Sequence, residues 1–191
     1  MIFRLTLKLS KKIRIAPLPA LPSDKNNNPL IDWSAHLFTA QRTQYIILTN
    51  TASLYSMVMP GRGIADDRQF IRGVLSCMKE FMTIDGNKVI FEKGIEPESH
   101  DVFFSKATDR RVAGSINDLI FQAKVHLIEG QQSPFDVSLL LNESPMSYLG
   151  YNRPKDEFKK LFFKDGESSA KRQGKDNVIY INIVRPPTTK I

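Results

Sequence analysis

The polar segment from Thr108 to Asp118 contains the residue types best suited to chemistry. It lies between a predicted strand and a predicted helix, where polar groups are often presented at the edge of a sheet. Arg110 or Arg111 could hold a carboxylate or a phosphate beside the first turn of the helix. The candidate binding residues of this segment are Asp109, Arg110, Ser115, Asn117 and Asp118.

A purely structural interpretation of the same segment is also open. Thr108 or Asp109 can cap the helix by accepting hydrogen bonds from free N–H groups of its first turn. Glycine, serine, asparagine and aspartate are weak helix formers, so their presence in the first two turns needs a reason. In this interpretation Gly114 allows the helix to pack closely on the sheet, and Ser115, Asn117 and Asp118 bond to neighbouring loops.

Elsewhere the sequence contains few residues in a catalytic arrangement. The histidines His36, His100 and His126 lie far apart and do not have metal-ligand spacing with the single cysteine, Cys77. His36 is the best catalytic candidate of the three because it lies near Trp33 in a mixed segment, and both residues join the candidate site. We predict no metal and no cofactor, and the lack of a recognisable catalytic constellation argues against an enzyme.

The positive net charge of the chain favours a polyanionic partner. Lysine and arginine number 27 against 20 aspartate and glutamate, which gives a formal charge of +7. Such an excess favours nucleic-acid binding through phosphate contacts. Much of it lies near the two ends of the chain, in residues Lys8, Lys11, Lys12, Arg14, Lys171, Arg172, Lys175, Arg185 and Lys190.

The N-terminal residues alternate apolar side chains with Arg4, Thr6 and Lys8, so they lack the continuous apolar core of a signal peptide. No stretch approaches the roughly 18 apolar residues of a membrane span. A single cysteine permits no disulfide within the chain and suits a reducing compartment. We therefore predict a cytoplasmic protein without a membrane partner.

Hydrophobic periodicity predicts an α+β fold, with a small, mostly antiparallel sheet covered by two main amphipathic helices and by short helices. The strand segments are Ile2–Leu9, a hairpin of Tyr45–Leu48 and Leu54–Met59, and Asp101–Lys106; the main helices span Asp67–Met82 and Arg111–Ile128. Asp32–Phe38 is predicted as a helical turn or a short helix. We expect one domain over residues 1–163, a flexible linker over 164–177, and a C-terminal strand extension over 178–191.

The order of these features resembles an uncharacterised bacterial domain family of about 160 residues. The resemblance rests on Trp33-Ser-Ala-His-Leu-Phe38, the hairpin with Thr49-Asn50, the segment Phe104–Asp118, Leu141-Asn-Glu-Ser-Pro-Met146, and Leu149-Gly-Tyr151. It covers Ile2 to Phe163 apart from the proline-rich connection after Arg14. It implies a domain boundary and a bacterial or mobile-element origin, but no catalytic role.

Three functional hypotheses follow, in descending order. The first is a non-enzymatic binding or protein-interaction module, with the C-terminal strand as a place to pair with another protein. The second is nucleic-acid binding through the basic ends. The third is an enzyme that uses the segment Thr108–Asp118 with His36 across a pocket. The sequence identifies no ligand or partner.

Overall fold

The computed structural model describes residues 1–15, 18, 28–107 and 109–173, with 164–173 described as backbone alone. Its centre is a five-stranded sheet in the order β4-β3-β2-β1-β5. The strands are β1 (Ile2–Leu5), β2 (Asp32–Ala40), β3 (Thr43–Asn50), β4 (Ser56–Pro60) and β5 (Phe103–Lys106). Strand β1 runs parallel to β2 and β5, whereas β2–β3 and β3–β4 are antiparallel pairs.

The α+β class is thus confirmed, and the sheet is mixed, because β1 adds two short parallel pairs to the longer antiparallel ones. The hairpin predicted from the apolar runs is β3 and β4. The predicted strand at Asp101–Lys106 is β5, but it lies beside β1 at the far edge from the hairpin. Parallel neighbours need long crossover connections, and the helical segments between β4 and β5 provide one of them.

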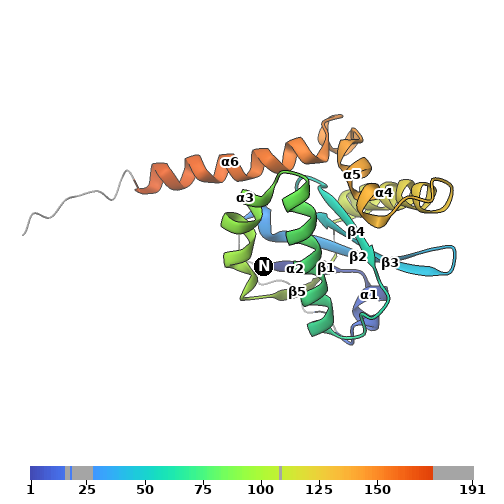
Figure 1. Cartoon of the computed structure of the whole chain (residues 1–191). Coiled ribbons are helices and arrows are strands. Elements are labelled where there is room, and N and C mark those ends of the chain that lie inside the picture. The colour runs from blue at the N-terminus through green and yellow to red at the C-terminus, as the bar shows by residue number, and fades with distance from the viewer. Residues whose placement is uncertain (16–17, 19–27, 108, 174–191) are drawn as a thin grey trace, which may run out of the picture.

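Helices cover both faces of the sheet (Figure 1). They are α1 (Leu7–Lys12), α2 (Asp67–Ile84), α3 (Lys88–Ile90), α4 (Arg110–Ile128), α5 (Pro134–Glu143) and α6 (Pro154–Gln173). Short 3₁₀ or π turns lie at Pro29–Ile31, Phe91–Ile95, Glu96–Ser99 and Ser147–Leu149. The two main predicted helices are α2 and α4, and α2 begins as expected, with the Asp66 carboxylate accepting a hydrogen bond from the Gln69 N–H at 2.7 Å.

The alternation of β2 divides the interior into two hydrophobic clusters. Trp33, Ala35 and Leu37 belong to the larger cluster, which includes the buried face of α2. Phe38 belongs to the smaller cluster, which contains buried residues of α4 and α5. Side chains of neighbouring strand residues point to opposite faces, so Ser34 and His36 face the α4 side. This half of the sheet face is polar, and it forms the floor of the candidate site.

The free edge of β4 is capped by side chains of α5. The Asn142 amide accepts a hydrogen bond from the Ser56 N–H at 2.7 Å and donates one to the Ser56 carbonyl at 2.8 Å. The Ser138 hydroxyl accepts from the Val58 N–H at 2.8 Å. Unpaired edge groups invite another strand, and α5 satisfies these three groups within the chain.

Two local predictions from the sequence are wrong. Ile2–Leu9 is a strand only to Leu5, after which α1 begins. Leu5, Leu9 and Ile13 are all buried, and residues four apart share one helix face as well as one strand face, so the pattern fitted both structures. Asp32–Phe38 is the strand β2 rather than a helical turn, because its polar residues alternate with core residues across the sheet.

Helix α6 begins at Pro154, as the sequence predicts, and continues to Gln173. Residues 164–173, predicted as part of a linker, therefore lie in a helix, which extends away from the sheet (Figure 1). The segment contains good helix formers such as Glu167, Ala170 and Lys171 among its glycine and serines. Residues 174–177 of the predicted linker, and the C-terminal strand at 178–191, lie outside the described residues.

Candidate functional site

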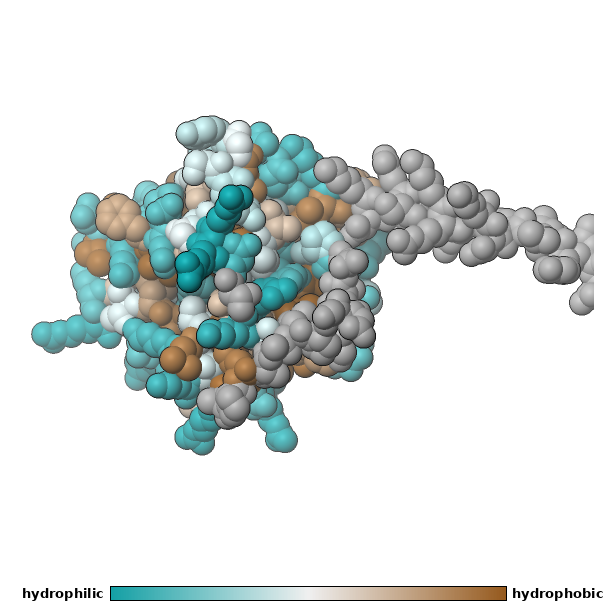
Figure 2. Space-filling model, turned by 180° about the vertical axis from the view of Figure 1, so that it is seen from behind, coloured by the Kyte–Doolittle hydropathy of each residue, from teal (hydrophilic) through white to brown (hydrophobic). Residues whose placement is uncertain are grey.

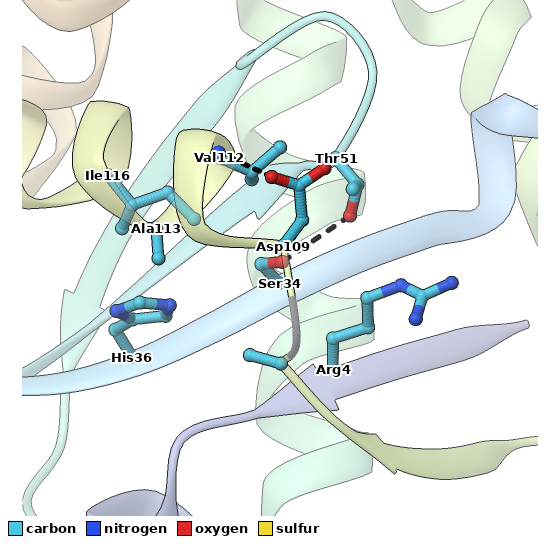
Figure 3. A pocket seen from close by; sticks show the side chains of 9 residues that line it. Arg4, Ser34, His36, Thr51, Asp109, Val112, Ala113 and Ile116 are labelled. Atoms are coloured by element: carbon cyan, nitrogen blue, oxygen red, sulfur yellow. Dashed lines mark hydrogen bonds between the residues drawn. The ribbon is translucent and has the colours of Figure 1, made fainter. Parts of the chain in front are cut away.

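A cavity of about 260 Å³ lies between the first turns of α4 and the polar half of the sheet face. Strand β5 ends just before it, and β1 and β2 provide its floor (Figure 3). In open sheets with parallel strands, ligands bind in crevices at the carboxyl ends of those strands. The lining residues are Arg4, Ser34, His36, Thr51, Ala107, Asp109, Val112, Ala113 and Ile116.

Arg4 is held by Asp32 and is not free to grip a ligand anion. Its Nε and Nη2 atoms donate to the two carboxylate oxygens of Asp32, each at 2.7 Å. This hydrogen bonding raises the pKa of Arg4 above its usual value, against a smaller opposing effect of burial. In Figure 3 the guanidinium points away from His36, so Arg4 forms a wall of the cavity rather than a contact at its centre.

Two hydroxyl groups of the cavity lining lie next to this ion pair. The Thr51 hydroxyl donates to Oδ1 of Asp32 at 2.9 Å, and the Ser34 and Thr51 hydroxyl oxygens lie 3.4 Å apart. Ser34 follows the register of the parallel pair, in which it lies opposite Arg4. Because hydroxyl groups both donate and accept, this part of the cavity suits a ligand with uncharged polar groups.

Asp109 occupies the N-terminus of α4. Its Oδ1 accepts hydrogen bonds from the Arg111 N–H at 2.8 Å and the Val112 N–H at 3.2 Å. These are the groups that would otherwise bind an anion at the start of a helix. An anionic ligand here would meet the Asp109 carboxylate instead, so the first cavity favours a neutral or cationic group.

His36 lies under α4, close to Ala113 and Ile116 (Figure 3). Only 7% of the residue is exposed, and burial lowers the pKa of its imidazole to about 4. The ring is therefore neutral at neutral pH. Its Nε2 atom is buried and has no hydrogen-bond partner among the described residues. A buried polar atom without a partner is uncommon and calls for an explanation such as a bound molecule.

The structure places the predicted site residues in several separate places. Asp109 and His36 line the same cavity, and Asn117 lines a neighbouring hollow that also contains His36. Arg110 and Asp118 are exposed on α4. Trp33 is fully buried in the cluster on the opposite side of the sheet, where its Nε1 donates to the Leu30 carbonyl at 2.9 Å.

The structural interpretation of the Thr108–Asp118 segment is wrong at two residues. Gly114 is exposed, and a Cβ atom there would meet nothing within 4 Å, so this glycine does not serve close packing. The Ser115 hydroxyl donates to the Arg111 carbonyl of its own helix at 3.2 Å rather than to a loop. Asp109 does cap the helix, as expected.

Sequence reasoning missed Arg4, Ser34 and Thr51. For Arg4 and Ser34 the signal is the alternation of β1 and β2, in which polar residues in the middle of otherwise apolar strands mark a polar patch on one sheet face. Thr51 lies in the turn after β3 and carries no such signal. For Ser34 the helical prediction at Asp32–Phe38 obscures this signal, because it places the residue on a helix instead of a sheet face. Within the described ranges, no three His, Cys, Asp or Glu side chains are grouped so that they could hold a metal ion. Likewise, no helix there is long and apolar enough to cross a membrane.

Comparison with known proteins gives one match. Residues 2–157 match the model of a domain family of unknown function. No curated protein and no solved structure matches the chain. The match covers the sheet, the cavity and the start of α6.

Proposed function

Since the chain belongs to the family DUF6933, a domain of unknown function, its site has to indicate its role, and we propose a non-enzymatic binding module for a small polar molecule. The observation that carries the proposal is the buried Nε2 of His36, a residue that lines the cavity: this atom has no partner among the described residues. A ligand hydroxyl or amide would provide that partner.

The size and polarity of the cavity narrow the ligand class. About 260 Å³ lies just below the range of roughly 300–1,000 Å³ typical of drug-sized ligands, so we expect a metabolite-sized molecule. The Ser34 and Thr51 hydroxyls offer donors and acceptors, and Asp109 disfavours an anion at this end. A small molecule also agrees with the surface away from α2, where hydrophobic side chains form small separate patches among hydrophilic ones (Figure 2).

The geometry gives little support to the enzyme hypothesis. Asp109 is engaged by backbone N–H groups, and Ser115 is engaged by its own helix. His36 is near Asp109 in the cavity lining but has no hydrogen bond to a nucleophile within the described part of the chain. A base must reach the proton that it abstracts, directly or through one water. We therefore favour binding without chemistry.

The proposal includes a bacterial, cytoplasmic setting. The support is the resemblance of the sequence to a bacterial family and its single cysteine, which suits a reducing compartment. A protein partner that pairs with the C-terminal strand is a separate possibility, and that strand lies outside the described residues.

The test is a ligand screen detected at His36. The full chain, labelled with ¹³C-histidine, is titrated with polyols, nucleosides, amides and amines, and the ring signals of all three histidines are followed. We expect at least one class to shift the His36 signals saturably. Binding by the variants is followed at the backbone amides of Thr51 and Val112, which line the same cavity. It should be lost in His36→Phe and weaker in Ser34→Ala, while His100→Phe, at an exposed residue, should bind as the parent does.

Two results would contradict the proposal. One is a screen in which no class shifts the His36 signals. The other is saturable binding that His36→Phe and Ser34→Ala both leave unchanged, provided that thermal unfolding shows each variant to be folded. The Ser34→Ala arm removes a hydroxyl without adding bulk, so it is informative even where a phenyl ring disturbs the packing under α4.

A further inference from the structure

A second hollow, of about 410 Å³, lies beside the first and shares His36 with it. It is found where β1 has ended and α1 begins, between β2 and the middle of α4. Thr6 and Lys8 line it from the β1–α1 side, and Asn117 and Lys124 line it from α4. The two hollows thus lie along successive turns of α4, one before His36 and one after it.

The charge of the second hollow is opposite to that of the first. Two lysines and no acidic residue line it. Lys8 is exposed and Lys124 is half-buried, and neither belongs to an ion pair in the described part of the chain. In the first hollow, by contrast, Arg4 forms an ion pair with Asp32. The N–H groups at the N-terminus of α4 donate to the Asp109 carboxylate there. Only the second hollow offers uncommitted positive charge.

Two residues that line this hollow, Thr6 and His36, also carry buried polar atoms without a partner. The Thr6 hydroxyl oxygen is buried and, like Nε2 of His36, has no partner among the described residues. Thr6 follows the last registered pair of the parallel strands, Leu5 opposite Ala35, and its N–H donates to the Ala35 carbonyl at 3.3 Å. That register brings Thr6 beside His36. A hollow lined by a hydroxyl donor and two lysines suits the oxygens of a carboxylate or a phosphate.

We propose that the second hollow is an anion subsite, which holds the carboxylate or phosphate of the small molecule whose uncharged polar part contacts His36 in the first hollow. The inference rests on the proposed function and adds the charge of the ligand and its orientation. The ligand would be a small dipolar metabolite, with a hydroxyl- or amine-rich end under the first turns of α4. Its anionic end would lie between Lys8 and Lys124.

The first test uses inorganic phosphate and, in a parallel arm, acetate, at constant ionic strength maintained with chloride. The His36 ring signals and the backbone signals of Thr6 and Asn117 are followed by NMR. We expect saturable shifts from at least one of the two anions. The anion that binds more tightly shows whether the subsite prefers a phosphate or a carboxylate. The variant Lys8→Gln/Lys124→Gln should weaken that binding about tenfold or more, the loss expected for removing charge-assisted hydrogen bonds.

The matched control is Arg72→Gln/Lys93→Gln, which also removes two positive charges, from exposed residues that do not line the hollow. It should bind the anion as the parent does. The inference is overturned if neither anion gives saturable shifts. It is also overturned if the control weakens binding as much as the Lys8→Gln/Lys124→Gln variant, because the effect would then be one of net charge.

Failure of the inference can be told from failure of the proposed function. A neutral compound that shifts the His36 signals should bind the double variant as well as the parent, because it needs no lysine. If a neutral compound binds and neither anion does, the anion subsite is overturned while the proposed function stands. A short single-stranded oligonucleotide is the last arm: tight binding of it by the parent, with no saturable phosphate binding, would overturn the small-ligand subsite and favour a nucleic-acid surface.

Discussion

The side chains of Arg4 and Asp32 form a two-pronged ion pair that ties β1 to β2 at the rim of the cavity. Both hydrogen bonds are 2.7 Å long, and the two side chains are 22% and 18% exposed. The Thr51 hydroxyl, which follows β3, donates to the same carboxylate. One carboxylate thus joins three strands at the place where the parallel and antiparallel parts of the sheet meet.

Asp32→Asn should lower the free energy of unfolding by about 2 kcal/mol, because it leaves the shielded guanidinium of Arg4 without its charged partner. Urea unfolding measures the loss. The double variant with Arg4→Gln should lose less than the sum of the two single variants, since both remove the same interaction. Strict additivity would contradict a coupled pair. Lys88→Gln, which breaks an exposed pair with Glu92, should change stability by less than about 0.5 kcal/mol.

His36 should make the protein less stable in acid. Its pKa in the folded state is about 4, against 6.5 for the free side chain, so the unfolded chain takes up the proton first as the pH falls. The free energy of unfolding should therefore decrease between about pH 6.5 and pH 4, by about 3 kcal/mol in total from this residue. His36→Gln should show a smaller decrease over that interval. Equal decreases in the parent and the variant would show that His36 does not cause them.

The fold was predictable where hydrophobic periodicity was unambiguous. Helices α2 and α4 and the β3–β4 hairpin follow from long or well-bounded patterns. The parallel pairs of β1 could not be predicted, because they join segments far apart in the chain and depend on crossover connections. The boundary between β1 and α1 was not predicted for a local reason: the spacing of Leu5 and Leu9 fits both the two-residue period of a strand and the four-residue spacing of a helix face.

The site was predictable only in part. The sequence predicts Asp109 as a helix cap, and it indicates His36 as a candidate because this residue lies in a mixed segment near Trp33. Their shared cavity could not be derived, because it depends on which face of β2 meets α4. Arg4 and Thr51 looked like ordinary surface residues of a strand and a turn, and only the tertiary pairing with Asp32 brings them to the cavity.

Gly114→Ala should stabilise the protein by about 1 kcal/mol, because alanine is the better helix former and its Cβ would meet nothing within 4 Å. Gly73→Ala, in α2, should give less stabilisation. Its Cβ would lie 3.1 Å from Cε of Met59 and 3.5 Å from Cδ1 of Ile64, so Met59 would have to move. Thermal unfolding of both variants measures the difference. A larger gain at Gly73 would contradict the close contact assigned there.

Asn142→Leu should destabilise the protein by about 3 kcal/mol, because it leaves the buried N–H and carbonyl of Ser56 without partners. Hydrogen exchange of the Ser56 amide should become faster in the variant, relative to the amides of β2. Ser144→Ala, which removes an exposed hydroxyl bonded to the Leu140 carbonyl, should change stability by less than about 0.5 kcal/mol.

The same change should alter how the protein behaves in solution. Once α5 no longer satisfies the edge of β4, the free groups of Ser56 can pair with a strand of another molecule. Light scattering of Asn142→Leu at rising protein concentration should therefore show association that the parent and Ser144→Ala do not show. A destabilised variant that stays monomeric would mean that the Asn142 hydrogen bonds stabilise β4 but are not needed to protect its edge, which the other residues of α5 would keep covered.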